Sequence, residues 1–578
     1  MSKIDITHKK AIHSFQLGQF EQAITLLKEV LRINPSKEEA IFYLANSFKE
    51  IESYNEAISL YHRLIDLNSK KVNYLINLAL LYKNVGKINK SIELFKQVFL
   101  KDPNNIEGYF NLGNLLRDIG QFHASINCYE KCIGLNPSFF DALNNLANVQ
   151  FLLGNIDDSI KIYRKTLSIR PKDPYVFNNY LCTLSYSVKS SNETILLESK
   201  KFNKLLEQEV KFYSESYIDS SNKNKLRIGF VSGDFRSHPV GYFLRPLLEN
   251  LDKDKFDIFS FSNNPFDDSY TLTLKNFFDS WLDIKSLSDK TVAELVYKSE
   301  IDFLIDLSGH TGHNRLPIFA FRPARFQLTW LGYWSTTGVN EIDYIIGDPH
   351  IMPPNNDKFY TEKVLRLPNT RWCYSMENYL DNKNESFNLK KEKFTFGYMG
   401  NFAKVNKEVI DVWISLLKEF PDTNIFLKSR VFLDTEIKKM FENFFINQKI
   451  NPKRVTLEAH GNKEEYLRSF LKLDIFIDTY PFSSGTTIID SLSMGTPVLT
   501  RYGDTAISRE GYSILKNLAL DAWAVKNKQS LINEFRSILE SDLVNIKSNI
   551  KERIFQSEIF DGKKFARDFE VLLENLTK

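Results

Sequence analysis

The sequence has few cysteines and no long apolar run, and both absences narrow the possible classes of protein. Only four of its 578 residues are cysteine, Cys128, Cys132, Cys182 and Cys373, and they form no CxxC pair. This usage gives no disulfide framework and suits a reducing compartment. No stretch of eighteen apolar residues occurs, and residues 1–10 contain no apolar core of the secretory type. We therefore expect a soluble, cytoplasmic protein without a membrane partner.

An excess of one charge sign is also absent. The 75 basic and 72 acidic residues give a net charge of +3 and are mixed throughout the chain, so we expect no nucleic-acid partner. A GxGxxG fingerprint is missing as well, which argues against a dinucleotide-dependent dehydrogenase. The length predicts about three or four domains of roughly 150 residues each.

What the sequence does contain is a pattern that returns five times in the first 171 residues at a spacing of 34. The recurring positions are Ala11, Ala45, Ala79, Gly113 and Ala147; Ala23, Ala57, Ser91, Ser125 and Ser159; Leu27, Tyr61, Phe95, Tyr129 and Tyr163; Pro35, Pro103, Pro137 and Pro171; and, between the helices, Gly18, Glu52, Gly86, Gly120 and Gly154. This is the tetratricopeptide signature, in which helix pairs stack because no single pair can bury its apolar face. Ser69 replaces the proline once, so we expect the second repeat to be the weakest.

After residue 225 the pattern changes to short apolar strands separated by helical stretches, which predicts parallel sheets covered by helices. The expected strands are 226–231, 256–261, 303–307, 327–331 and 344–346 in one set, and 394–399, 424–427, 455–457, 475–477 and 497–499 in another. We therefore expect an α-solenoid followed by a two-lobed α/β core. The expected domains are the solenoid, 1–186, with a partial sixth repeat at 175–186; a capping helix, 193–212, and linker within 187–225; a first lobe, 226–385; and a second lobe, 386–578. Polar runs at 220–225 and 378–393 mark boundaries.

The segment 478–500, DTYPFSSGTTIIDSLSMGTPVLT, is the most informative chemically. After a predicted strand it places a flexible turn that ends at Gly485, then Thr486 and Thr487 at a helix start, and Asp490 one turn further on. The free N–H groups of a helix start can bind an anion, and a carboxylate nearby can accept from sugar hydroxyls. The segment suits a nucleotide diphosphate with its ribose, and ordinary N-capping is the alternative.

Other polar residues follow strands as well. Asn401 and Lys404 come after the first strand of the second lobe, where a lysine can neutralise charge on a departing phosphate. A solvated surface lysine is the alternative. Lys463 and Arg468 are further cations in the segment 460–470, and taken singly they stay ambiguous.

Three histidines stand where strands of the first lobe end: His238, His310 and His313. A metal site is conceivable, but His310 and His313 lack a third ligand at a usual spacing. A role in gripping or deprotonating a hydroxyl acceptor is favoured, because histidine titrates near neutral pH. A purely structural role for each remains open.

The motifs RIGFVSGDFRSHPVGYF (227–243), DLSGHTGHNRL (306–316), GYWSTTG (332–338), GNFAKV (400–405) and GTTIIDSLSMGTPVLT (485–500) follow the repeats in this order. From about residue 10 to 560 the chain resembles a bacterial member of the protein O-N-acetylglucosamine transferases and the related SPINDLY proteins, glycosyltransferase family 41. The resemblance implies a GT-B core, inverting and without metal or cofactor, that moves a sugar from a nucleotide diphosphate to a Ser or Thr hydroxyl of a protein.

The resemblance also implies roles for single residues. Lys404 stabilises the diphosphate leaving group, Asn401 lies beside the nucleotide, Lys463 lies near base and ribose, Thr486 and Thr487 contact the diphosphate, Asp490 binds ribose, and His238 matches a histidine proposed as catalytic. We add Arg468, Gly485 and His310 to the residues expected to bind the nucleotide sugar. The family often has GYPGTTG where this chain has GYWSTTG, so Trp334 and Ser335 are departures from it. Tyr466 and Gly485 are further departures, because they replace histidines of animal members. Because of these changes, the resemblance does not determine which sugar and which nucleotide base the donor carries.

Four asparagines also recur at a spacing of 34, Asn77, Asn111, Asn145 and Asn179. On the first helices of the repeats they form a predicted ladder along the concave face. A carboxamide can both donate to and accept from one peptide unit, so the ladder can hold an extended acceptor chain. The alternative is that asparagine is merely tolerated on a wetted face.

We therefore expect a transferase that moves N-acetylglucosamine from UDP-GlcNAc to proteins held by the solenoid. One alternative is another donor, such as GDP-fucose, used on flagellin or another surface protein. A second alternative is a repeat scaffold without catalytic activity.

Overall fold

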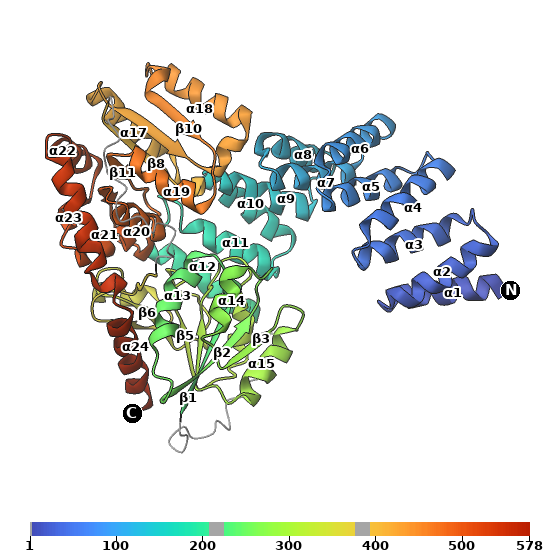
Figure 1. Ribbon diagram of the computed structural model, residues 1–578, viewed down its shortest axis with the longest axis horizontal. Coiled ribbons are helices and arrows are strands. Elements are labelled where there is room, and N and C mark those ends of the chain that lie inside the picture. Colours follow the sequence, from blue (N-terminus) through green and yellow to red (C-terminus); the bar gives the residue numbers. More distant parts are fainter. Residues whose placement is uncertain (1–2, 207–224, 376–392) are drawn as a thin grey trace. The chain divides into compact units, whose positions relative to one another are not determined.

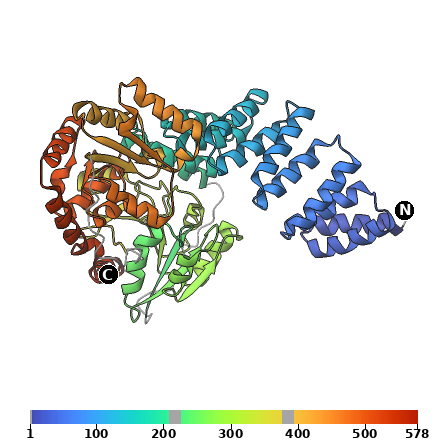
Figure 2. The same cartoon turned by 45° about the horizontal axis from the view of Figure 1, so that its top comes forward.

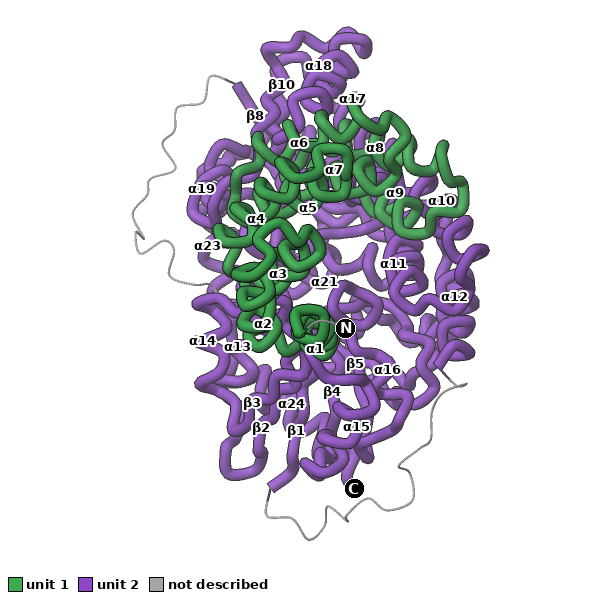
Figure 3. The backbone as a smooth tube through the Cα atoms, turned by 90° about the vertical axis from the view of Figure 1, so that its right-hand side faces the viewer, with its two compact units in different colours: residues 1–149 green, residues 150–578 purple. Residues whose placement is uncertain are grey.

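The computed structural model describes residues 3–206, 225–375 and 393–578 (Figure 1). The chain forms two compact units, residues 1–149 and 150–578 (Figure 3). The polar runs predicted as boundaries, 220–225 and 378–393, lie almost entirely outside the described residues.

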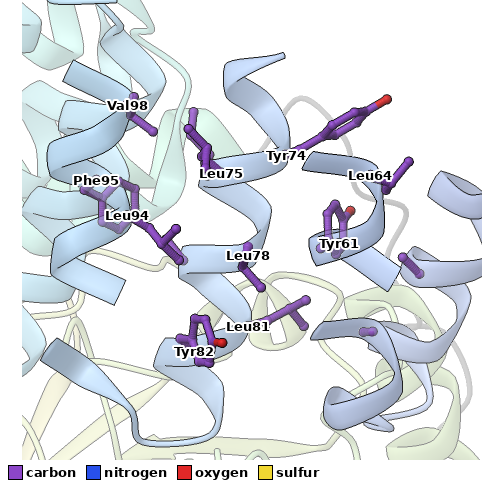
Figure 4. Packing of buried hydrophobic residues seen from close by; sticks show 14 of the residues in the cluster. Tyr61, Leu64, Tyr74, Leu75, Leu78, Leu81, Tyr82, Leu94, Phe95 and Val98 are labelled. Atoms are coloured by element: carbon purple, nitrogen blue, oxygen red, sulfur yellow. The ribbon is translucent and has the colours of Figure 1, made fainter. Parts of the chain in front are cut away.

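Unit 1 is a succession of helix pairs, as the repeat predicts (Figure 2). Its helices are α1 (Lys3–Gln16), α2 (Phe20–Ile33), α3 (Glu38–Glu50), α4 (Tyr54–Leu67), α5 (Val72–Asn84), α6 (Ile88–Lys101), α7 (Ile106–Asp118), α8 (Phe122–Leu135) and α9 (Phe140–Leu152), whose last residues belong to unit 2. Tyr61 of α4 and Phe95 of α6 are fully buried in one cluster with Leu75 and Leu78 of α5 (Figure 4). Each helix pair therefore buries the large side chain of its second helix, such as Tyr61 or Phe95, against the neighbouring pair. This burial is why stacking stabilises the array.

The small residues that recur at a spacing of 34 allow the two helices of a pair to approach closely. Ala45 and Ala57 have no exposed surface in α3 and α4. Where the second helix carries serine, the hydroxyl bonds to the first helix: Ser91 Oγ donates to Ala79 O at 2.7 Å, and Ser125 Oγ donates to Gly113 O at 2.8 Å. Serine in this register thus stabilises the pair without requiring more space.

The turn inside each pair needs a left-handed backbone conformation. Gly18, Gly86, Gly120 and Gly154 have φ between +73° and +82°, and Glu52 takes the same place with φ +60°. Glycine adopts this region at little cost, whereas a side chain is strained there. The second repeat therefore has an unfavourable turn residue in addition to its missing proline.

Unit 2 begins with α10 (Ile156–Ile169), α11 (Pro174–Leu184) and α12 (Asn192–Leu206). The partial sixth repeat predicted at 175–186 is α11, whose first turn is capped by the Asp173 carboxylate, a 2.9 Å acceptor from Val176 N. The helix predicted over 193–212 is α12 up to Leu206, and its remainder lies outside the described residues.

The first lobe contains a parallel sheet in the order β3-β2-β1-β4-β5-β6-β7. Its strands are β1 (Leu226–Ser232), β2 (Phe256–Ser262), β3 (Ser280–Asp283), β4 (Phe303–Asp306), β5 (Phe326–Thr329), β6 (Tyr344–Gly347) and β7 (Lys363–Arg366), and its helices are α13 (Pro239–Asn250), α14 (Ser269–Lys275), α15 (Asp289–Lys298) and α16 (Leu316–Ala320). The sequence did not predict β3 and β7, the two edge strands.

The second lobe contains another parallel sheet, in the order β10-β9-β8-β11-β12-β13. Its strands are β8 (Thr395–Met399), β9 (Asn424–Lys428), β10 (Val455–Glu458), β11 (Ile475–Ile477), β12 (Val498–Arg501) and β13 (Ala524–Val525), and its helices are α17 (Lys407–Glu419), α18 (Thr435–Asn447), α19 (Lys463–Ser469), α20 (Thr486–Ser493), α21 (Glu510–Asn517), α22 (Lys528–Leu539) and α23 (Leu543–Phe555). The prediction of helical repeats followed by two parallel-sheet lobes is confirmed.

The last helix, α24 (Gly562–Thr577), packs against α13 of the first lobe, although the sequence places it in the second. The Trp330 ring lies 6.0 Å from the Phe565 ring and 5.2 Å from the Phe569 ring, centroid to centroid. This helix therefore ties the end of the chain back to the first sheet. Within the described ranges, no helix is long and apolar enough to cross a membrane.

Candidate functional site

Strands β8 and β11 are neighbours in the second sheet, so the segments that follow them meet at its carboxyl edge. The segment after β8 carries Asn401 and the short 3-10 helix η3 (Phe402–Lys404), and the segment after β11 leads into α20. Two motifs that are about 80 residues apart in the sequence are thereby brought together.

The turn between β11 and α20 is fixed by the buried carboxylate of Asp478. Ser483 Oγ donates to it at 2.7 Å, Ser484 N at 3.1 Å, and Thr500 Oγ1 from β12 at 2.7 Å. Burial raises the pKa of Asp478, and the bonds from Ser483 and Thr500 together with the charge of Lys404 oppose that rise. A turn held by a fully bonded carboxylate is rigid before any ligand arrives.

Among the described residues, no acceptor is found for the first backbone N–H groups of α20. Gly485 is the N-cap residue, and its carbonyl accepts from Ile488 N at 3.1 Å and Ile489 N at 3.2 Å. No side chain among the described residues caps this helix, so the alternative of ordinary capping by threonine and an acid is wrong. Thr486 and Thr487 are half-buried and form its first turn, which leaves a polar, positive helix end suited to an anion.

Lys404 points at this turn. Its Nζ lies 3.3 Å from Ser484 Oγ, 3.5 Å from Ser483 O and 4.5 Å from the centre of the Phe482 ring. Burial lowers the pKa of Lys404, while the carboxylates of Asp478 and Glu510 oppose this. The structure thus places a largely desolvated cation beside the turn that precedes the helix start, where it can act strongly on bound charge.

Asp490 lies inside α20 with 2% of its surface exposed, and both of its oxygens are bonded. Tyr374 Oη donates to Oδ1 at 2.8 Å, and Lys463 Nζ lies 3.0 Å from Oδ2. Burial, followed by the charge of Asp490, raises the pKa of Tyr374, so its hydroxyl stays protonated and donates. Two residues that the sequence treated separately, Lys463 and Asp490, form one ion pair.

Tyrosines surround this pair, and of these sequence reasoning named only Tyr466, as a departure from the animal members, and missed Tyr242 and Tyr374. Lys463 Nζ lies 5.1 Å from the ring centre of Tyr466 and 5.5 Å from that of Tyr242, which belongs to α13 of the first lobe. Tyr374 also comes from outside the second sheet, after β7. Single tyrosines carry no motif, so only their position after strands and helix starts could have singled them out.

His238 is the N-cap residue of α13 and 35% of its side chain is exposed. Its Nδ1 accepts weakly from Val240 N at 3.4 Å and lies 3.6 Å from Asp234 Oδ2. Burial and the charge of Arg236 lower the pKa of His238, and Asp234 opposes them, so the ring is neutral at pH 7. The two partners of Nδ1 require opposite tautomers, and only the pairing with Asp234 leaves Nε2 free to accept a proton.

His310 lies in a different environment from the one its predicted role requires. It is 1% exposed, Nδ1 lies 2.5 Å from Asn178 Oδ1 of α11, and Nε2 lies 2.8 Å from Thr337 O. Its ring also packs edge-on against Phe202 of α12 at 4.8 Å. Because both ring nitrogens are bonded within the protein, His310 joins the last solenoid helices to the first lobe, and nucleotide-sugar binding by it stays a prediction.

Two other predicted residues have local partners. Arg468 is exposed on α19 and pairs with Glu464 at 3.0 Å. Asn401 caps η3, with Oδ1 accepting from Ala403 N at 3.1 Å. Across the described residues, no group of three or more His, Cys, Asp or Glu side chains could hold a metal ion.

The predicted ladder residues lie on the first helices of their repeats. Asn77, Asn111 and Asn145 are half-buried in α5, α7 and α9, and Asn179 is half-buried in α11 of unit 2. Asn145 Nδ2 donates to Asn114 Oδ1 at 2.8 Å, and Asn77 Nδ2 donates to a carbonyl of its own helix at 2.9 Å. Binding of an acceptor chain by these amides stays a prediction.

Comparison with known proteins gives matches along most of the chain. Residues 189–384 and 376–569 match the family model described as Glycosyl transferase family 41, and residues 12–37, 72–105 and 140–173 match a Tetratricopeptide repeat model. A solved structure, a lysine-to-methionine mutant of the O-GlcNAc transferase of Thermobaculum terrenum, is 26% identical with a TM-score of 0.80, covering 88% of this chain and 97% of that one.

Curated relatives are similar over about three fifths of the chain. The probable UDP-N-acetylglucosamine--peptide N-acetylglucosaminyltransferase SPINDLY of Solanum lycopersicum is 30% identical over 359 residues, 61% of this chain and 38% of that protein. The UDP-N-acetylglucosamine--peptide N-acetylglucosaminyltransferase of Caenorhabditis elegans is 22% identical over 476 residues, 62% of this chain and 41% of that protein. The chain spans about two fifths of the length of the curated relatives it matches.

Proposed function

Because the chain belongs to glycosyl transferase family 41, we propose that it transfers N-acetylglucosamine from UDP-GlcNAc to Ser or Thr hydroxyls of proteins. The observation that carries this proposal is the position of Lys404 beside the turn that precedes the uncapped start of α20. A half-buried cation and free backbone N–H groups at one place suit a diphosphate better than any neutral ligand.

In the proposed reaction the acceptor hydroxyl attacks the anomeric carbon, and the bond from that carbon to the diphosphate oxygen breaks. The N–H groups of Thr486 and Thr487 bind the diphosphate, and Lys404 neutralises the charge that grows on it as it leaves. Such preorganised stabilisation is worth roughly 3–4 kcal/mol for a single donor. Inversion at the anomeric carbon and independence of metal are part of the proposal and rest on the family.

The acceptor side of the proposal involves His238 and the solenoid. In the proposal, the Nδ1–H of a neutral His238 turns to Asp234, whose Oδ2 lies 3.6 Å away, and Nε2 then takes the proton of the acceptor hydroxyl. The amides of Asn77, Asn111, Asn145 and Asn179 hold the acceptor chain through its backbone.

The proposed donor is UDP-GlcNAc, because the relatives at 22–30% identity carry that donor in their names. The alternative donor, GDP-fucose or another nucleotide sugar used on flagellin or a surface protein, is kept because Gly485 and Tyr466 replace histidines of animal members. A scaffold without activity is disfavoured by the half-buried Lys404 beside the turn that leads into the uncapped helix.

The test is calorimetric titration of the purified chain with UDP, GDP and CDP, repeated on Asp490→Ala. We expect UDP to bind most tightly and the variant to lose most of that affinity, because the ribose partner is gone and Lys463 is left unpaired. If GDP binds most tightly, the alternative donor, a GDP-sugar, is supported. If none of the three nucleotides binds, the alternative of a repeat scaffold without catalytic activity is supported. Asp411→Ala, on the exposed face of α17, is the matched control.

A further inference from the structure

A second carboxylate lies beside the proposed diphosphate site, and the function proposed above does not use it. Glu510 is the first residue of α21 and only 4% exposed. An ideal Cβ built on Gly485 would lie 3.4 Å from Glu510 Oε2, so the carboxylate occupies the space beside the N-cap of α20 that a side chain at residue 485 would fill.

This carboxylate accepts no hydrogen bond from the described residues, and its oxygens are not among the fully enclosed polar atoms left without a partner. Its charge is held instead by Arg371 and Lys404 nearby, neither of which comes close enough for a 4 Å ion pair with it. Burial raises the pKa of Glu510 to about 7, opposed by Arg371 and Lys404 and reinforced by Asp478 and Asp348. The acceptor capacity of the group is thus unused within the protein.

Two adjacent residues near this carboxylate, Arg371 and Trp372, have side-chain donors without partners among the described residues. Arg371 is fully buried and donates through Nη2 to Leu331 O at 2.8 Å, while its Nε and Nη1 find no partner there. Trp372 Nε1 is also unpaired there, and the Cη2 atom of its benzene ring lies 3.6 Å from the ideal Cβ of Gly485. An acceptor without a hydrogen bond beside Gly485, with the charge of Arg371 near it, suits a ligand hydroxyl.

The framework around Glu510 is fixed on both sides. Gly511 N, the next backbone donor, bonds to Ser483 Oγ at 2.9 Å, which ties α21 to the turn before α20. Ser513 Oγ bonds to Asp348 Oδ2 at 3.1 Å, and the same oxygen accepts from Arg371 N at 3.0 Å. Glu510 and Arg371 are therefore held in place without a direct bond between them, as a preorganised binding site requires.

We propose that Glu510 is a specificity-determining residue that accepts a hydrogen bond from a hydroxyl group of the donor sugar, beside the diphosphate held at the start of α20. The inference rests on the proposed function, since it needs a nucleotide sugar. A carboxylate next to the diphosphate repels phosphate oxygens but binds hydroxyls, so the part of the donor that contacts Glu510 is its sugar. Residue 485 is a glycine, and Glu510 places a carboxylate oxygen beside it.

The test compares nucleotide diphosphate and nucleotide sugar on the full chain. For wild type, Glu510→Gln and Glu510→Ala, affinities for UDP and UDP-GlcNAc, and for GDP and GDP-fucose, are measured by calorimetry. We expect Glu510→Ala to weaken the sugar nucleotide by about tenfold, the loss of one charged hydrogen bond, while the matching diphosphate changes by less than about twofold. Glu436→Ala, an exposed acid in the first turn of α18, is the control.

Deoxygenated donors locate the hydroxyl. Among analogues of the preferred donor that each lack one ring hydroxyl, wild type should discriminate against one, and Glu510→Ala should not. Glu510→Gln keeps the shape and one acceptor oxygen, so it should keep part of the discrimination, and its unfolding temperature checks that the fold survives.

Equal losses for the diphosphate and its sugar would overturn the inference, because Glu510 would then act through Lys404. Unchanged affinities for both would overturn it as well. If wild type binds no nucleotide diphosphate, the proposed function fails and the inference fails with it, so the two failures are told apart by the wild-type titration alone.

Discussion

Lys404 is the residue on which the proposed chemistry depends most. Replacing it by methionine keeps the length and packing against Phe482 but removes the charge. We expect turnover to fall by at least about a hundredfold, because the leaving diphosphate loses its cation. Lys407→Met, an exposed lysine at the start of α17, is the matched control and should keep wild-type turnover. Retained turnover in Lys404→Met would remove this lysine from the mechanism.

His310 makes a contribution to stability whose pH dependence follows from its burial. Burial lowers the pKa of His310 to about 4, with the bond to Thr337 O acting in the opposite direction. Above pH 6.5 the ring is mainly neutral in both the folded and the unfolded chain. As pH falls from 6.5 to 4 only the unfolded chain takes up the proton, so stability is lost over this range, on the order of 3 kcal/mol in total.

The check is the free energy of unfolding against pH for wild type and His310→Gln. Glutamine can keep one of the bonds to Asn178 and Thr337 but does not titrate. We expect the variant to be less stable at pH 7 and the gap to narrow towards pH 4. Asp306 and Glu510, whose pKa values burial raises to about 6 and about 7, titrate in both proteins and cancel in the difference. A gap that is constant with pH would contradict the prediction.

Residue types and their spacing predicted Lys404, Lys463, Thr486, Thr487 and Asp490 as candidates, but not how they are paired. The pairing of Lys463 with Asp490 depends on α19 and α20 lying side by side, and the bond from Tyr374 depends on a segment that follows the first sheet. Glu510 was missed for the same reason. An acid in a helix's first turn is common, and only the fold shows that this one is buried beside Gly485.

At the scale of elements, periodicity predicted the helices of the repeats because five copies reinforce one another. The strands predicted in both lobes were those with continuous apolar runs. β3 and β7 escaped because SWLD and KVLR, at the sheet edges, are only partly buried, and β13 escaped because it has two residues. An edge strand needs fewer apolar residues, so its sequence resembles a loop.

The turn of the second repeat can be improved. Glu52 has φ +60°, where a side chain costs about 1 kcal/mol or more relative to glycine. We expect Glu52→Gly to stabilise unit 1 by roughly 0.5–1 kcal/mol, since the greater freedom of the unfolded chain offsets part of the gain. Urea unfolding of the full chain measures this, and Glu52→Ala, which keeps a Cβ, should give no gain. If both substitutions changed the stability equally, the gain would not come from relief of the positive φ, and the prediction would be wrong.

At the scale of the whole molecule, the proposed function assigns donor chemistry to unit 2 and most of the ladder that holds the acceptor to unit 1, with Asn179 as the ladder residue in unit 2. All the residues proposed to bind the diphosphate belong to unit 2, whereas Asn77, Asn111 and Asn145 belong to unit 1. The two activities should therefore respond separately to substitution.

Asn111→Ala is the sharpest test of this separation, because Asn145 is bonded to Asn114 and its loss would disturb the repeat itself. We expect transfer to protein acceptors in a cell extract to fall by about fivefold for one lost amide contact, with nucleotide affinity unchanged. The control is Asn104→Ala, an exposed asparagine in the loop before α7. Donor hydrolysis measured without a protein acceptor should stay at the wild-type rate, because water replaces the acceptor and does not have to be bound by the asparagines. A parallel loss of transfer and hydrolysis would mean that the solenoid acts on the catalytic lobes and not on the acceptor.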